Sequence, residues 1–69
     1  MSTFQVGDEV YAFVELIGPG WFHGVIVGLT NVVVTAYNIK LDAEAGWKPW
    51  RQGHELRTPE EHAAALLAL

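Results

Sequence analysis

Val6-Gly7-Asp8-Glu9-Val10-Tyr11-Ala12 is the stretch of the sequence that decides the fold. Glycine accepts a positive φ and aspartate bonds neighbouring backbone amides, so the Gly7-Asp8 pair predicts a tight turn that starts a strand at Glu9. Alternate residues of that strand, expected over 9–16, then fall on opposite faces. The apolar face holds Val10, Ala12 and Val14, and the other face holds Glu9, Tyr11, Phe13 and Glu15. This period of two predicts a half-buried β-strand.

A second strand is predicted over 21–29, after a turn at Gly18-Pro19-Gly20. Gly24 and Gly28 mark places for a bulge or for sharp coiling, by which a short sheet closes on itself. Trp21 and Phe22 are adjacent and so face opposite sides of the strand. One of the two rings is expected in the core, and the other under a loop, in a subunit contact or in a ligand site.

The third strand is predicted over 32–37, a β-branched run that follows a turn at Thr30-Asn31. The pattern leaves open which face of this strand is buried. Two apolar sets alternate, one of Val32, Val34 and Ala36, the other of Val33, Tyr37, Ile39 and Leu41.

The rest of the chain predicts shorter elements. Residues 42–46 are expected to form a loop or one helical turn, and 47–51 a fourth strand in which Pro49 requires an edge or a bulge. A closing strand or 3₁₀ segment is predicted over 54–57. Thr58-Pro59-Glu60-Glu61 forms a capping box with proline at the first helical position, so a helix is expected over 59–67. Its apolar stripe of Ala63, Leu66 and Leu67 is expected to dock on the sheet or on another subunit.

Size and composition favour self-association. The 69 residues are expected to form a single domain, the barrel over about 6–57, that buries roughly 60% of its unfolded surface. There is no cysteine to add a disulfide or a thiolate metal site. The hydrophobic fraction is 51%, with three Trp, three Phe and two Tyr, which is more apolar surface than so small a barrel can hide. We therefore expect a homo-oligomer.

Charge and the chain's ends narrow the classes of partner. The net charge of −4 opposes binding to nucleic acid, although all four basic residues lie in the second half of the chain. The first residues lack the basic and apolar regions of a signal peptide, and no segment is apolar for the ~18 residues that a membrane span needs. A cytoplasmic protein without membrane contact is expected.

The chain contains a series of motifs, which in chain order are Gly-Asp-x-Val-x-Ala, the glycine turn, Trp21-Phe22-x-Gly24-Val25-Ile26, the valine-rich strand and Leu56-Arg57-x-Pro59. In this series the chain resembles the Tudor-like group of SH3-like barrels. The resemblance implies an all-β fold, a small five-stranded SH3-like barrel with a short C-terminal helix. In Tudor domains an aromatic cage holds a methylated ammonium group. Phe22 matches the second-strand aromatic of the cage and Tyr37-Asn38 resembles the Tyr-Gly-Asn of that family, whereas Val14 stands where the family has tryptophan.

A weaker resemblance is to the plasmid-type (type II) dihydrofolate reductases, which are tetramers of SH3-like chains. It rests on Thr3-Phe4-x-x-Gly7-Asp8-x-Val10 and Gly24-x-Ile26-Val27-Gly28. Their pore-lining Val-Gln-Ile-Tyr segment is missing from this chain, in which residues 33–37 occupy the comparable region. The resemblance therefore supports an oligomer more than reductase activity.

The chemistry-bearing residues favour binding over catalysis. His23, His54 and His62 have no metal-ligand spacing, and no carboxylate pair or serine lies in a catalytic context, so we expect no metal, no cofactor and no catalytic residue. The predicted function is a binding or assembly module for a peptide or a small planar ligand. Two alternatives stay open: an oligomeric enzyme of the dihydrofolate reductase kind, and a structural subunit of a larger complex. The expected ligand surface consists of Tyr11, Phe22, Tyr37, Asn38, Trp47 and Trp50.

Overall fold

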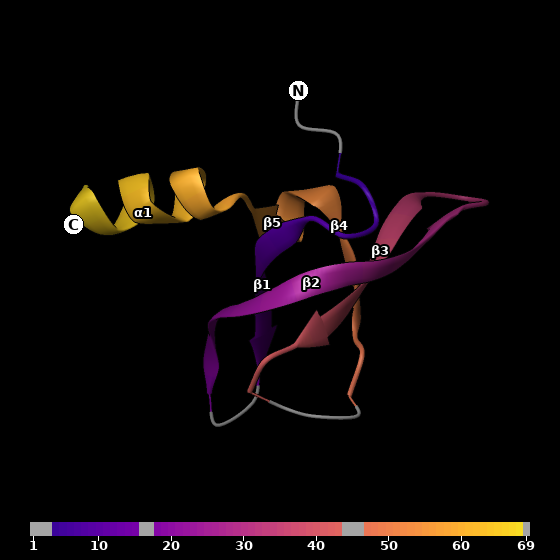
Figure 1. Cartoon of the computed structure of the whole chain (residues 1–69), viewed down its shortest axis with the longest axis horizontal. Helices are drawn as coiled ribbons and strands as arrows, with labels where there is room; N and C mark the ends of the chain where they lie inside the picture. Colours follow the sequence, from indigo (N-terminus) through magenta and orange to yellow (C-terminus); the bar gives the residue numbers. More distant parts are fainter. Residues whose placement is uncertain (1–3, 16–17, 44–46, 69) are drawn as a thin grey trace.

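The computed structural model describes residues 4–15, 18–43 and 47–68, which form a curled, antiparallel half-barrel followed by a helix (Figure 1). The strands are β1 (Glu9–Glu15), β2 (Pro19–Asn31), β3 (Thr35–Leu41), β4 (Trp50–Gln52) and β5 (Leu56–Arg57), in the sheet order β4-β3-β2-β1-β5. A 3₁₀ turn, η1 (Gly53–Glu55), precedes β5, and α1 (Pro59–Leu67) follows it. The five-stranded all-β fold with a C-terminal helix is thus confirmed.

The turn before β1 has the geometry that Gly7-Asp8 predicted. Gly7 has a φ of 98°, a value that favours glycine. The Asp8 carboxylate accepts the backbone N–H of Gln5 at 2.9 Å, and the Asp8 N–H donates to the Gln5 carbonyl at 3.0 Å. The Gly7 N–H in turn donates to the Ile26 carbonyl at 2.8 Å, so the turn is tied to β2.

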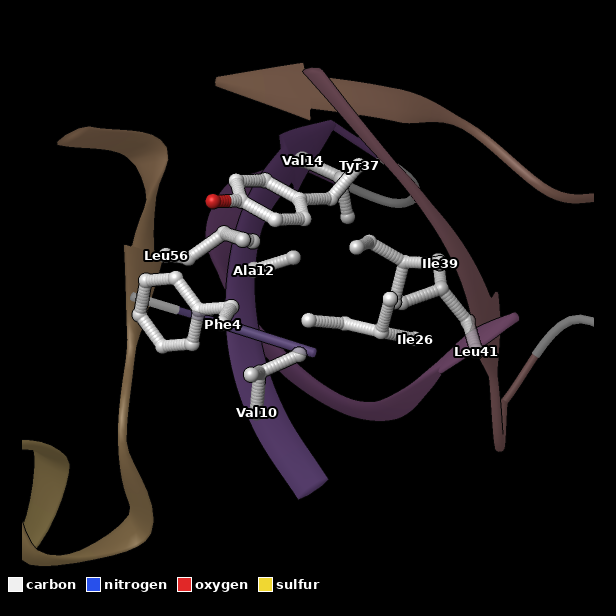
Figure 2. Packing of buried hydrophobic residues seen from close by; sticks show 9 residues of the cluster. All are labelled: Phe4, Val10, Ala12, Val14, Ile26, Tyr37, Ile39, Leu41 and Leu56. Carbon is white, nitrogen blue, oxygen red and sulfur yellow. The ribbon is translucent and has the colours of Figure 1, made fainter. Parts of the chain in front are cut away.

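The core fills the concave side of the sheet (Figure 2). Val10, Ala12 and Val14 are buried on β1, as the period of two predicted, and Phe22 packs against them from β2. Phe4 also lies in the core, with its ring edge-on to Tyr37, a place that the sequence pattern did not assign to it. The full set of buried apolar residues is Phe4, Val10, Ala12, Val14, Ile26, Tyr37, Ile39, Leu41 and Leu56.

Gly24 and Gly28 of β2 lie where the strand approaches or shifts against β3. At Gly24, β3 passes so close that a Cβ would come within 2.7 Å of both the Ile39 methyl Cγ2 and the Lys40 carbonyl oxygen. The β2–β3 register then shifts between Ile26 and Gly28, which places a bulge beside the second glycine. The predicted bulge is confirmed, and close approach explains the first glycine.

The predicted boundary between the second and third strands was wrong. β2 continues through Thr30 and Asn31, and the chain bends at 32–34, so that β3 begins only at Thr35. The local β-branched pattern is overridden because strand pairing places the turn between Asn31 and Thr35, whose side chains are hydrogen-bonded at 2.8 Å. The open question of facing is settled for β3, in which Tyr37, Ile39 and Leu41 are buried.

Two other boundaries shift by a few residues. β2 already begins at Pro19, inside the predicted turn at Gly18-Pro19-Gly20, at the end of its pairing with β1. The fourth strand is also shorter than predicted and begins after Pro49, at the edge of the sheet. The end of the first predicted strand, residue 16, and residues 44–46 of the predicted loop lie outside the described residues.

The C-terminal elements match the prediction except in how the helix docks. Both the 3₁₀ turn and the closing strand are present, and Thr58 and Glu61 form the capping box at the start of α1. Ala63, Leu66 and Leu67 are exposed, so the expected apolar stripe does not dock on the sheet, and its docking on another subunit stays a prediction. The half-buried side of α1 carries His62 and Ala65 instead.

Candidate binding surface

The six residues that the sequence singled out lie in three different environments. Asn38 and Trp50 are register partners on β3 and β4, and Trp47 directly precedes Lys48, whose carbonyl accepts a hydrogen bond from Asn38. Tyr11 lies on the outer face of β1, beside α1. Phe22 and Tyr37 belong to the interior: Tyr37 is 5% exposed, and Phe22 packs against the core. The structure therefore does not unite the six in one surface, and Tyr37 is not part of any exposed one.

The segment before β4 is anchored to β3 through Asn38. The side-chain amide of Asn38 donates to the backbone carbonyls of Lys48 and Pro49. The Ile39 N–H donates to the same Pro49 carbonyl at 2.9 Å, and the Pro49 side chain is buried. Asn38 thus uses its donor inside the protein, so its role is to position the segment that carries the two tryptophans.

The two indoles at the ends of this segment face solvent. Trp47 is 38% exposed and Trp50 is 50% exposed. Trp50 is the register partner of Asn38, which is in turn the partner of Gly28 on β2. A Cβ on Gly28 would lie 3.9 Å from Cη2 of the Trp50 ring, so the indole extends across the strand toward this glycine. We call Trp47, Trp50, Asn38 and Gly28 the tryptophan surface.

Tyr11 is enclosed by two histidines rather than open to a ligand. Its ring stacks on His62 of α1, with centroids 3.9 Å apart and an interplanar angle of 14°. On the other side it meets His23 of β2 edge-on, at 5.3 Å. Because the stack joins α1 to β1, it is one of the contacts by which the helix docks on the sheet.

His23 carries charge-assisted contacts on both ring nitrogens. Nδ1 lies against the Asp42 carboxylate, and Nε2 lies 3.1 Å from a carboxylate oxygen of Glu9. The hydrogen bond to Asp42 raises the pKa of His23 above its ordinary value, with Glu9 adding to the effect, while partial burial opposes it. The imidazolium form is therefore the one that these two carboxylates stabilise.

The same outer face continues into a group of residues that the sequence reading did not assign to a site. Trp21 meets Phe13 edge-on at 5.4 Å, and the Arg57 guanidinium lies 3.9 Å above the Trp21 ring. Arg57 also contacts the Nδ1 atom of His62 at 3.4 Å. The signal was available in the period of two, since Phe13 is in phase with Tyr11, but the role of Arg57 depends on the late strand β5 pairing with β1.

A second exposed apolar region lies at the end of the β2–β3 hairpin. The β1–β2 register ends at Val25, and Ile26 is bonded to Gly7 and Asp8, whereas the β2–β3 register continues to the turn. We call residues 27–35 the hairpin arm, and Figure 1 shows it projecting from the sheet on the side opposite α1. Its exposed large apolar residues are Val27, Leu29, Val32, Val33 and Val34.

No enclosed site among the described residues, and no known relative, assigns a role to this chain. In the described part of the chain there is no pocket and no group of three or more His, Asp or Glu side chains placed to hold a metal ion. The helices among those residues are too short to cross a membrane. Comparison with known proteins gave no match to a family model, to a curated protein or to a solved structure.

Proposed function

We propose that this protein is a non-enzymatic binding and assembly module, a small SH3-like barrel of the Tudor-like kind that acts as a homo-oligomer and presents an aromatic surface to a peptide. The observation that carries the proposal is the tryptophan surface, where two large rings are held toward solvent by a buried proline and by the Asn38 hydrogen bonds. Such rings cost free energy to expose, so their rigid placement favours a role in recognition.

The spacing and chemistry of this surface favour an extended, proline-rich peptide. Trp47 and Trp50 flank Pro49 at an edge of the sheet, and exposed indoles are the groups on which the rings of a polyproline II helix pack. Aromatic side chains supply contact area at a low cost in conformational entropy, and the anchored segment lowers that cost further. Phe22 and Tyr37, which also belong to the expected ligand surface, stabilise the sheet from its core side instead: Tyr37 lies in the core and Phe22 packs against it.

The fluorescence of the three tryptophans tests the proposal directly. In the variant Trp21→Phe, emission comes only from Trp47 and Trp50, whereas in Trp47→Phe/Trp50→Phe it comes only from Trp21. Titration with a set of proline-rich decapeptides is expected to shift or quench the emission of Trp21→Phe, because the bound peptide covers both indoles. The double variant is the matched control, and its emission is expected to stay constant.

The same titration followed by amide chemical shifts locates the contact. Shifts centred on residues 47–52 and on Gly28 and Asn38 are expected. If no peptide in the set changes either the Trp21→Phe emission or these amide signals, the proposed peptide function is wrong. If the signals of Tyr11 and α1 respond instead, binding occurs at the outer face and the tryptophan surface is not the site.

A further inference from the structure

The hairpin arm is the least protected part of the sheet. Val32 and Val33 are 89% and 92% exposed, and Leu29 and Val34 are about half exposed. Exposed strand edges are usually protected by charged residues, proline or a covering loop. The sequence has no charged residue and no histidine between His23 and Lys40, so the arm has none of the charge protection that its exposure calls for.

The arm also offers backbone for pairing. Beyond Ile26, β2 has β3 as its strand partner among the described residues, and β3 meets β4 only over Ala36–Asn38. A two-stranded ribbon with apolar side chains is marginally stable by itself in water. Another strand or apolar face laid against it would remove this weakness.

We infer that the hairpin arm is the surface by which two copies of this chain associate, arm against arm. The inference rests on the homo-oligomer of the proposed function and names the surface that forms it. A symmetric dimer requires a patch that is complementary to itself, and an uncharged hairpin rich in valine meets that requirement.

Charge favours a second copy at this place. Each copy carries a net charge of −4, so two copies repel one another over most of their surfaces. The arm is the long uncharged stretch of the chain, and contact through it brings no acidic side chains of the arms together. Arm-to-arm contact therefore adds no repulsion between charged side chains of the two arms.

An interface formed by the arm alone is small. Each arm offers five exposed large apolar residues, whereas specific interfaces begin at about 1,000 Å² of total buried area. The stability of such an interface depends on the central valines. A charged side chain in place of one of these valines is expected to dissociate the dimer without unfolding the barrel.

Paired charge variants test this inference. In Val33→Glu and in Val33→Lys the arms of two identical copies carry like charges, and each variant is expected to sediment as the 7.6 kDa single chain, whereas the wild type has twice that mass. An equimolar mixture of the two variants is expected to restore the double mass, because the charges are then opposite. Circular dichroism equal to that of the wild type shows that each variant is folded.

Leu67→Glu is the control, since it adds a charge at an equally exposed apolar residue at the other end of the molecule. It is expected to keep the wild-type mass. If both Val33 variants keep the double mass, or if Leu67→Glu alone dissociates the protein, the arm is not the interface, although the homo-oligomer stands. If the wild type is a single chain at every concentration, the homo-oligomer fails as well. Because Gly28 belongs to both surfaces and Trp50 lies beside it, the peptide titration is repeated on the single-chain Val33→Glu variant, so that peptide binding is measured apart from association.

Discussion

Gly24 of β2 lies directly against Ile39 of β3, so closely that a Cβ on the glycine would come within 2.7 Å of the Ile39 methyl group. The Lys40 carbonyl oxygen lies equally close, and this atom belongs to the backbone and cannot turn away. Ile39 is itself fully buried. The curl of the sheet over its core therefore depends on the absence of a side chain at position 24.

Gly24→Ala is expected to destabilise the fold by about 2–3 kcal/mol, because the methyl group forces the two central strands apart. The midpoint of urea unfolding measures the loss. Gly53→Ala is the matched control, since no atom lies within 4 Å of a Cβ at that position, and its effect is expected to stay within about 0.5 kcal/mol. Equal losses in the two variants would contradict the close approach of β2 and β3.

Asn38→Asp is expected to release the segment that carries the tryptophans. The substitution replaces an N–H donor by a carboxylate oxygen facing the carbonyls of Lys48 and Pro49, and it costs about 1–3 kcal/mol. In a Trp21→Phe background the emission of Trp47 and Trp50 should shift to longer wavelength as their environment becomes more mobile and hydrated. Asn31→Ala, at the hairpin turn, should leave that emission unchanged.

Tyr11→Ala is expected to loosen α1, because it removes the ring on which His62 stacks. We expect a loss of about 1–2 kcal/mol and faster amide hydrogen exchange throughout the helix. Leu67→Ala changes an almost fully exposed residue of the same helix and should alter neither quantity. Unchanged exchange in Tyr11→Ala would mean that the helix is held by other contacts.

Stability should decrease as the pH rises through the raised pKa of His23. In the folded protein the imidazolium is favoured by Asp42 and Glu9, so the folded state binds the proton more tightly than the unfolded state does. The contribution is fully present below the ordinary histidine pKa of about 6.5 and is lost as the pH rises through the higher folded value. The expected change is about 0.5 kcal/mol, as for an exposed ion pair.

Urea unfolding of the wild type and of His23→Gln between about pH 5 and pH 8 checks this dependence. The difference between the two proteins isolates His23 from His54 and His62, and it should shrink toward the higher pH. A difference that grows with pH would contradict the assignment of Asp42 and Glu9 as partners of a protonated ring.

The sequence pattern predicted correctly those parts of the fold that depend on interactions between residues close together in the chain. The Gly7-Asp8 turn, the alternation on β1 and the Thr58 cap each depend on residues close together in the chain. Val32–Val34 misled the prediction, because β-branched residues favour a strand, whereas the position of this turn is set by how far β2 and β3 pair. The length of a hairpin depends on both of its strands, so the sequence of one strand alone does not predict it.

The candidate site was harder to predict for a related reason. Aromatic residue type singled out the exposed Trp47 and Trp50 together with the buried Tyr37, whose phase with Ile39 and Leu41 places it inside. The stack of Tyr11 on His62 joins residues from the two ends of the chain. Hydrophobic periodicity therefore did not find the side of α1 that faces the sheet, since half of that contact is a polar ring.

The central claim is that the apolar residues in excess of the core are placed where copies of this chain meet. A dilution series followed by amide chemical shifts tests it most directly, because the signals that change with concentration belong to the residues in contact. The account predicts changes confined to residues 27–35 and Trp50, in step with a halving of the molecular mass. Changes centred on α1, or spectra that stay the same at every concentration while the mass remains that of one chain, would contradict it.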